Sequence, residues 1–249
     1  MPLALLSHGE RIEAAHRAID YLMSRHEEEL SVPVLNCPGW TVYNTAVHVG
    51  RVSLSWGEWI RSDPGDPDAR ERGFAQLDQR SGVGLDTLAG WAHGTVDLVD
   101  GDESRAAFMP FVGGVGSHGL WARHCSAEIG IHRVDVEDAL GHDHGMSDTE
   151  AFDAACWAIE TIQPALAARG DVSLPSLRAE LVSHDGADVG IVERAVGSTE
   201  APVVIQGPAV QVLLAVWGRP HDRITVTNPE GFAVWTSTPG EQAQWPVWD

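Results

Sequence analysis

The sequence predicts an α+β protein, in which a four-helix bundle over residues 1–146 precedes a smaller α/β domain with a mostly antiparallel sheet over residues 147–249. In the first part, apolar residues recur every three or four positions in four segments, as in amphipathic helices. In the second part, short β-branched runs separated by Asp-Gly or Gly-Ser turns are typical of strands. Ser147 and Glu150 fit a capping box and mark the boundary.

The first two helices of the bundle have distinct starting signals. Ser7 and Glu10 fit a capping box, and an apolar stripe follows them, formed by Ile12, Ile19, Leu22 and Met23. Thr41 follows a Pro-Gly-Trp turn and is the expected N-cap of the second helix. The inward stripe of that helix is formed by Val49, Val52, Trp56, Trp59 and Ile60.

The other two helices are separated from these by loop signals. Residues 62–72 are dense in Asp, Pro, Gly and Arg, which predicts a solvated loop. Apolar residues at helical spacing over 85–98 predict a third helix that ends near Gly101. After a glycine-rich turn at 113–119, a fourth helix is expected from about Leu120 to Leu140, with Gly141 ending it.

The second domain is expected to open with a helix that Pro164 disturbs. Strands are then predicted over residues 177–183, 189–196 and 201–205, followed by a helix over 210–217. Two closing strands are predicted over residues 224–227 and 232–236. This order of elements predicts an α+β domain over residues 147–249.

Composition excludes several classes of protein. The formal charge of −20 at pH 7 would repel a phosphate backbone, so nucleic acid is not an expected partner. No stretch approaches the roughly 20 consecutive apolar residues of a membrane span. All 16 basic residues are arginine, which excludes lysine nucleophiles and Schiff-base chemistry.

Cysteine usage and the N-terminus point to an unexported, cytoplasmic protein. The three cysteines, Cys37, Cys125 and Cys156, are an odd number at wide spacing, which fits a reducing compartment better than a disulfide framework. The first 15 residues lack the basic flank and cleavage site of a signal peptide. A monomer is the expected oligomeric state.

Three polar residues on the predicted bundle helices carry the strongest functional signal. Glu128 and His132 lie four residues apart, so their side chains leave the fourth helix on one face, beside its apolar stripe. His48 takes a similar place on the second helix. A carboxylate at such a position must be paired or bind a metal, since burying an isolated charge costs several kcal/mol. Two histidines and a glutamate are a known ligand set of catalytic zinc.

The residue pattern also allows a purely structural interpretation. His48 would then be a core histidine, and Glu128 would pair with an arginine such as Arg51, Arg123 or Arg133. His124, one turn before Glu128, is a competing ligand or a residue that supports one. Spacing alone leaves these alternatives open, because Asp138 with His142 and Glu180 with His184 repeat the acidic-to-histidine spacing elsewhere in the chain.

Two longer segments carry a family resemblance. CPGWTVYNTAVHVG and ARHCSAEIGIHRVDVEDALG resemble the paired signature of the mycothiol-dependent maleylpyruvate isomerase family, within the wider group of DinB-like helical bundles. The segments LVSHDGADVGIV and VIQGPAVQVLLAVWGRP resemble that family's C-terminal domain, which is sterol-carrier-like. Together these segments extend over nearly the whole chain.

The resemblance implies a zinc ion held by His48, Glu128 and His132, with mycothiol as the thiol cofactor. It also implies that Arg219, in the Trp-Gly-Arg turn, acts as a catalytic and cofactor-binding residue. Trp40 is expected to line the thiol pocket. Cys37 before the Pro-Gly turn and His124 beside the ligand stripe depart from the family pattern, which bears on the substrate pocket and leaves the metal ligands unchanged.

The leading functional hypothesis is a zinc-dependent, mycothiol-using S-transferase or isomerase. Its expected partners are a low-molecular-weight thiol and a small electrophilic substrate that bears a carboxylate. Two alternatives remain: a non-catalytic ligand-binding or stress-response module, and a zinc hydrolase in which Asp135 is the nearest candidate for a general base.

Overall fold

The computed structural model describes residues 2–77, 83–170, 172–196 and 202–237. The chain folds into two compact units. The first unit comprises the described residues between Ser7 and Gly145, and the second comprises those from Met146 onward together with the segment before Ser7. Leu3 ties that N-terminal segment to the rest of the second unit, because its backbone N–H donates to the carbonyl of Val189.

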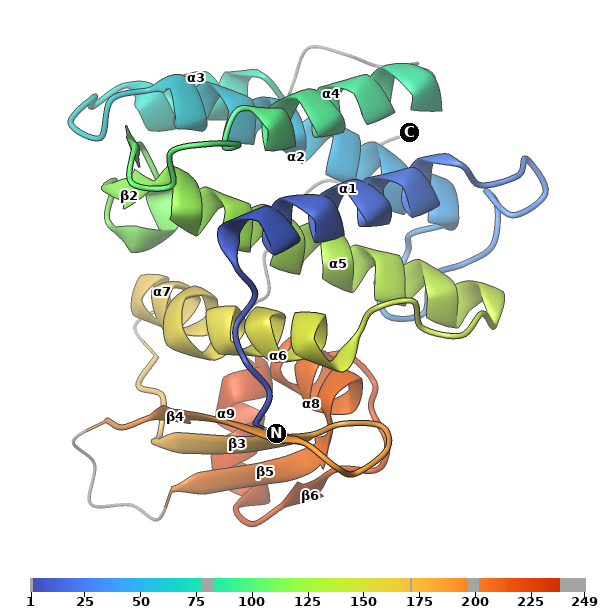
Figure 1. The fold of residues 1–249 in the computed structure, drawn as a ribbon, viewed down its shortest axis with the longest axis vertical. Coiled ribbons are helices and arrows are strands. Elements are labelled where there is room, and N and C mark those ends of the chain that lie inside the picture. Colours follow the sequence, from blue (N-terminus) through green and yellow to red (C-terminus); the bar gives the residue numbers. More distant parts are fainter. Residues whose placement is uncertain (1, 78–82, 171, 197–201, 238–249) are drawn as a thin grey trace. The chain divides into compact units, whose positions relative to one another are not determined.

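The first unit is built from helices that pack side by side (Figure 1). Helix α1 packs against α4 and α5, and α2 packs against α4 and α5. The capping box predicted at Ser7 and the N-cap predicted at Thr41 are both confirmed. The helices are α1 (His8–Met23), α2 (Val42–Arg61), α3 (Ala69–Ala75), α4 (Leu85–Asp97) and α5 (His118–Leu140).

Helix α3 lies in a segment whose composition predicts a loop. Its helical form depends on tertiary contacts with Trp59: the indole N–H donates to the carbonyl of Ala69, 3.0 Å away. Gly73 lies so close to the same ring that a Cβ atom there would clash with it. Between α4 and α5, a short hairpin of β1 (Ala106–Ala107) and β2 (Gly116–Ser117) encloses the 3₁₀ turn η1 (Pro110–Val112).

The second unit opens with α6 (Asp148–Trp157), the π-helical segment η2 (Ala158–Ile162) and α7 (Gln163–Arg169). The capping box of Ser147 and Glu150 is confirmed. The predicted disturbance near Pro164 takes the form of the π-helical segment, which immediately precedes the turn of α7 that holds this proline.

A four-stranded sheet follows, with strand order β4-β3-β5-β6. Strand β3 pairs antiparallel with β4 and parallel with β5, and β5 pairs antiparallel with β6. Helix α8 packs against β3, β5 and α6, and α9 packs against β5 and α8. The elements are β3 (Leu177–Val182), β4 (Val189–Arg194), β5 (Val203–Pro208), α8 (Ala209–Val216), β6 (Thr225–Val226) and α9 (Pro229–Ser237). The predicted α+β fold, with a helical part and a mostly antiparallel sheet, is confirmed.

The last predicted strand, residues 232–236, is wrong: these residues lie within helix α9. Phe232 and Trp235 are its buried residues, and their spacing of three suits a helix. The indole N–H of Trp235 donates to the carbonyl of Pro175, which anchors this helix to the segment before β3. Among the described residues, none of the helices has the length and apolar character to cross a bilayer.

Candidate metal centre

Three buried polar side chains from two helices converge inside the first unit. His48 projects from α2, and Glu128 and His132 project from one face of α5. All three are at most 2% exposed. Since α2 packs directly against α5, the two helices bring residues that are about 80 positions apart in the sequence into one cluster.

The ligand atoms of this cluster lie close enough to bind one ion. Oε1 of Glu128 is 3.5 Å from Nε2 of His132 and 4.0 Å from Nε2 of His48. The ligand atoms of all three residues lie within 4.8 Å of one another. Zinc makes bonds of about 2.0–2.2 Å to imidazole and carboxylate, so atoms with these separations can share an ion after small side-chain shifts.

Buried atoms of Glu128 and His132 have no hydrogen-bond partner among the residues that the structure describes. They are Oε2 of Glu128 and Nε2 of His132. A buried polar atom without a partner costs about 1–3 kcal/mol, and a divalent ion would satisfy both atoms at once. The donor set and these unsatisfied atoms therefore fit a zinc ion.

The electrostatics of the cluster follow from its burial and its mixed charges. Burial raises the pKa of the Glu128 carboxyl, but the nearby imidazoles of His132 and His48 outweigh this effect and hold the pKa below its ordinary value. Burial lowers the pKa of His132, but interactions with Asp135, Cys37 and Glu128 outweigh it and raise the pKa well above the ordinary value. The lowered pKa keeps the Glu128 carboxyl ionised, so that it can act as an anionic ligand.

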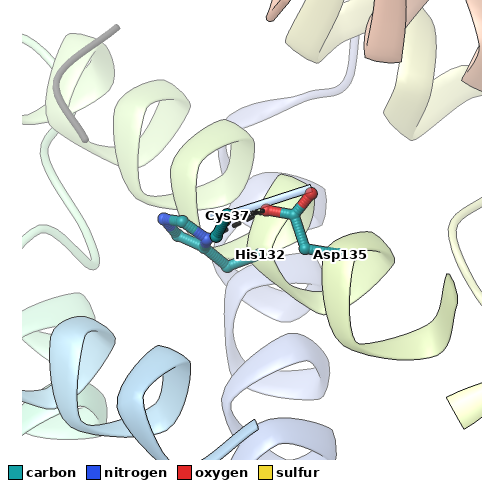
Figure 2. Close-up of side chains that lie close together, drawn as sticks. All are labelled: Cys37, His132 and Asp135. Atoms are coloured by element: carbon teal, nitrogen blue, oxygen red, sulfur yellow. Dashed lines mark hydrogen bonds and ion pairs between the residues drawn. The ribbon is translucent and has the colours of Figure 1, made fainter. Parts of the chain in front are cut away.

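The other ring nitrogen of His132 faces a second cluster (Figure 2). Nδ1 lies 3.1 Å from Oδ2 of Asp135, and the thiol of Cys37 donates to the same oxygen, 3.3 Å away. Asp135 projects from α5 one turn after His132, whereas Cys37 comes from the loop that precedes α2. Asp135 therefore faces Nδ1 of His132, whereas Glu128 faces Nε2.

Trp40 covers the two histidines of the cluster. Its ring centroid lies 4.8 Å from that of His48 and 5.9 Å from that of His132, and the indole is stacked on the His132 ring. Trp40 is itself buried. The residue expected to line a thiol pocket therefore packs against both histidines.

His124 has different surroundings. Its ring packs among Trp56, Phe111 and Trp121, with centroid distances of 4.8, 4.6 and 5.5 Å. Burial lowers the pKa of His124 to about 4, so it is a neutral core histidine near pH 7. In the part of the chain that the structure describes, neither group of potential metal ligands includes it.

The contacts of Glu128 bear on the alternative in which it pairs with an arginine. Within the cluster, Glu128 contacts His48 and His132. Arg133 instead pairs with Glu137, with 2.7 Å between Nε and Oε1.

Residues 12–137, just over half of the chain, match the family model of the mycothiol maleylpyruvate isomerase N-terminal domain. The chain belongs to this family. The resemblance inferred from the two signature segments is thereby confirmed. All residues of both clusters lie within the matched range.

Two crystal structures of mycothiol-dependent maleylpyruvate isomerase, one of them a histidine-to-alanine mutant, are similar to the chain in fold. The TM-score is 0.57 for both, with 16% sequence identity to the mutant and 15% to the other. Each comparison covers 90% of this chain and 95% of the solved one. No curated protein matches the chain.

Arg219, the remaining site residue expected in this family member, belongs to the second unit. It follows Gly218, which has a positive φ of 69°, and its guanidinium donates to the carbonyl of Trp217. The side chain is buried and borders a cavity of about 340 Å³. The cavity is lined by Gly218, Arg219, His221, Val226, Pro229, Phe232, Ala233 and Thr236.

The sequence interpretation missed the connection between Cys37, Asp135 and His132. Asp135 could have been found from its spacing of three residues from His132 on the same helix. Cys37 could not, because it reaches Asp135 from a loop almost 100 positions earlier in the chain.

Proposed function

We propose that the protein is a zinc-dependent enzyme that uses mycothiol to isomerise, or to transfer sulfur to, a small electrophilic substrate. The observation that carries the proposal is the buried cluster of His48, Glu128 and His132, in which Oε2 of Glu128 and Nε2 of His132 find no hydrogen-bond partner among the described residues. Membership of the mycothiol maleylpyruvate isomerase family supports the choice of thiol and of reaction class.

When bound, zinc and mycothiol would together supply a thiolate nucleophile near neutral pH, where a free thiol with a pKa of about 8.5 is mostly protonated. His48, Glu128 and His132 would hold the ion and leave a fourth position open, as in other catalytic zinc sites. The single negative charge of Glu128 would partly neutralise the ion. Trp40 would exclude water from the two imidazoles that it covers.

We assign substrate binding to Arg219. Its guanidinium fork can hold a carboxylate through two parallel hydrogen bonds, or stabilise an enolate that develops during the reaction. The expected substrate is therefore a small alkene that is conjugated to a carbonyl and bears a carboxylate, such as maleylpyruvate. Replacing Arg219 with lysine keeps the charge but removes the fork, so Arg219→Lys should raise KM for such a substrate.

The test is metal analysis of the purified wild-type protein beside His48→Ala and Glu128→Ala. We expect about one zinc per wild-type chain, and little in either variant. His124→Ala is the matched control, because it removes a buried histidine of α5 that lies outside the cluster. Circular dichroism would verify that each variant is folded. Equal zinc contents in the wild-type protein and both ligand variants would contradict the proposal.

Catalysis is tested separately from metal binding. Calorimetry should detect mycothiol binding to the zinc-loaded wild-type protein and not to Glu128→Ala, and isomerisation of maleylpyruvate should require both zinc and mycothiol. Zinc binding without any binding of mycothiol would retain the metal site and refute the thiol chemistry.

The cavity beside Arg219 supports a second candidate function, which is binding of a small apolar acid by the second unit. Val226, Pro229 and Phe232 supply apolar walls, and Arg219 supplies a cation. If binding alone is the function, a ligand of this kind should bind His48→Ala as tightly as the wild-type protein. The zinc hydrolase alternative is weaker, since Asp135 is engaged by Cys37 and lies close to Nδ1 of His132.

A further inference from the structure

The two nitrogens of the His132 ring have different surroundings. Nε2 faces Oε1 of Glu128 at 3.5 Å and makes no hydrogen bond to any residue that the structure describes. Nδ1 faces Oδ2 of Asp135 at 3.1 Å, which is within hydrogen-bond distance. A neutral imidazole carries one proton, and the hydrogen bond made by one nitrogen decides which lone pair is available on the other.

Cys37 reinforces the carboxylate that faces Nδ1. Its thiol donates to the same Oδ2 of Asp135, so that oxygen is fixed from two directions (Figure 2). Cys37, His132 and Asp135 are all at least 98% buried. Water therefore has little access with which to replace these hydrogen bonds.

One tight turn delivers both Cys37 and Trp40 to His132. The backbone N–H of Trp40 donates to the carbonyl of Cys37, 2.9 Å away, and Gly39 adopts a φ of 87° between them. The turn thus presents a thiol to the carboxylate behind the ring and an indole to the face of the ring. This loop therefore acts on His132 in two ways: Trp40 contacts the ring directly, and Cys37 fixes the carboxylate of Asp135 that faces Nδ1.

We propose that Cys37 and Asp135 form a positioning pair, which keeps a proton on Nδ1 of His132 and leaves Nε2 to bind the metal. The inference rests on the proposed zinc site. It assigns a role to Cys37, which the family resemblance left as an unexplained departure. Carboxylate partners of this kind orient metal-binding histidines in many proteins and increase the basicity of the ligand nitrogen.

Cys37, His132 and Asp135 have a second conceivable use, which is to bind an ion of their own, since their ligand atoms also lie within 4.8 Å of one another. The hydrogen bonding argues against this use. In this cluster, the thiol and the ring nitrogen already have the carboxylate as a partner. By contrast, Oε2 of Glu128 and Nε2 of His132 have no hydrogen-bond partner in the described parts of the chain, and Nε2 is the nitrogen of His132 that faces Glu128.

The first experiment measures zinc dissociation constants by chelator competition for the wild-type protein, Asp135→Asn, Cys37→Ala and Cys37→Ser. Asp135→Asn should weaken zinc binding about 10- to 100-fold, because an amide can donate to Nδ1 and place the lone pair on the wrong nitrogen. Cys37→Ala should weaken it about 3- to 10-fold, the scale of one lost hydrogen bond. Cys37→Ser keeps a donor and should restore most of the affinity.

This serine rescue separates positioning from packing, since serine and alanine are both smaller than cysteine. Equal affinities for the two Cys37 variants, or an unchanged affinity for Asp135→Asn, would overturn the inference. In the second experiment, NMR of the zinc-loaded protein with ¹⁵N-labelled histidine should show a slowly exchanging proton on Nδ1 of His132. A proton on Nε2 instead would also overturn it.

Two further outcomes distinguish this inference from the proposed function. If the wild-type protein binds no zinc, the proposed function fails, and the positioning role fails with it. If the wild-type protein binds zinc, and its cobalt-substituted form shows a thiolate-to-cobalt charge-transfer band that Cys37→Ser abolishes, the zinc site stands. Cys37 is then a metal ligand, and the positioning role is refuted.

Discussion

His132 is the residue at which the two clusters meet, and its protonation couples zinc binding to pH. Burial alone would lower the pKa of His132, but Asp135, Cys37 and Glu128 outweigh it and raise the pKa well above its ordinary value. Near neutral pH, the metal-free ring is therefore expected to hold two protons. Nε2 must lose its proton before it can bind zinc, so binding releases a proton to the solvent.

We accordingly predict that zinc affinity falls as pH is lowered. While the pH lies below the raised pKa of His132, each unit of acidification should weaken binding about tenfold, because one proton competes with the ion. Chelator competition between about pH 6 and pH 8 measures this slope. Calorimetry in two buffers that differ in ionisation enthalpy should independently report about one released proton. A dissociation constant that does not change over this range would contradict the prediction.

A second prediction for single residues concerns the protein's own thiols. All three cysteines are buried thiols. Burial raises the pKa of Cys125 to about 12, so at about pH 8 only about one molecule in 10,000 carries the reactive thiolate there. We expect iodoacetamide to leave Cys125 unlabelled in the native protein and to label it after unfolding in guanidinium. Mass spectrometry identifies the labelled site, and rapid labelling of native Cys125 would refute its burial.

Only part of the two clusters could be predicted from the sequence. Glu128 and His132 could be predicted as a pair, since a spacing of four on a helix fixes their common direction. Bringing His48 to them required the packing of α2 on α5, which the apolar stripes only suggested. The contact of Cys37 with Asp135 depends on the path of a loop, and no periodic pattern specifies that path.

Helix α2, which carries His48, depends on a close approach to α4. A Cβ atom at Gly50 would lie 2.6 Å from Cβ of Leu88 and 3.1 Å from its Cα, and Leu88 is fully buried. The first contact is to the stem of the side chain, and the second is to the backbone, so a change of rotamer cannot relieve the overlap. The two helices must move apart to accept any side chain at this position.

We therefore predict that Gly50→Ala destabilises the protein by about 1–3 kcal/mol, the usual range for overpacking in a core. Gly94→Ala in α4 is the matched control: this glycine is exposed, and a Cβ there would meet nothing within 4 Å. That change should stabilise the helix by about 0.5–1 kcal/mol. Urea unfolding of both metal-free variants tests the pair, and effects of the same sign would contradict the packing argument.

Helices with strong local signals could be predicted, and those that depend on tertiary contacts could not. The starts of α1, α2 and α6 follow from capping residues, and each is confirmed. Helix α3 forms against Trp59, and α9 buries Phe232 and Trp235. Trp59, which α3 packs against, lies outside the segment whose composition predicts a loop. The residues of α9 fit the pattern of a strand and that of a helix equally well.

Over the whole molecule, the dominant electrostatic feature is the excess of acidic residues. The chain has 36 acidic and 16 basic residues, and its isoelectric point is about 4.8. A net charge of this size destabilises the folded state, because folding brings like charges closer together. Favourable local pairs oppose this effect, as where Arg72 lies between Glu58 and Asp66.

We predict that net repulsion outweighs these local pairs, so that sodium chloride stabilises the metal-free protein at neutral pH. Raising ionic strength from about 0.01 M to about 0.15 M shortens the Debye length from about 30 Å to about 8 Å. Long-range repulsion is screened by this change, whereas ion pairs in direct contact lose less. A gain of about 1 kcal/mol would raise Tm by about 2–4 °C in a chain of this size.

Calorimetric melting in the presence of a chelator measures this shift without interference from bound metal. The same comparison at about pH 5.5, closer to the isoelectric point of about 4.8, is the internal control, because the net charge and hence the benefit of screening should be smaller there. If salt lowers Tm at neutral pH, contacts such as those of Arg72 contribute more to stability than the acidic excess removes. The net charge of the chain would then affect its solubility and its choice of partners rather than its folding stability.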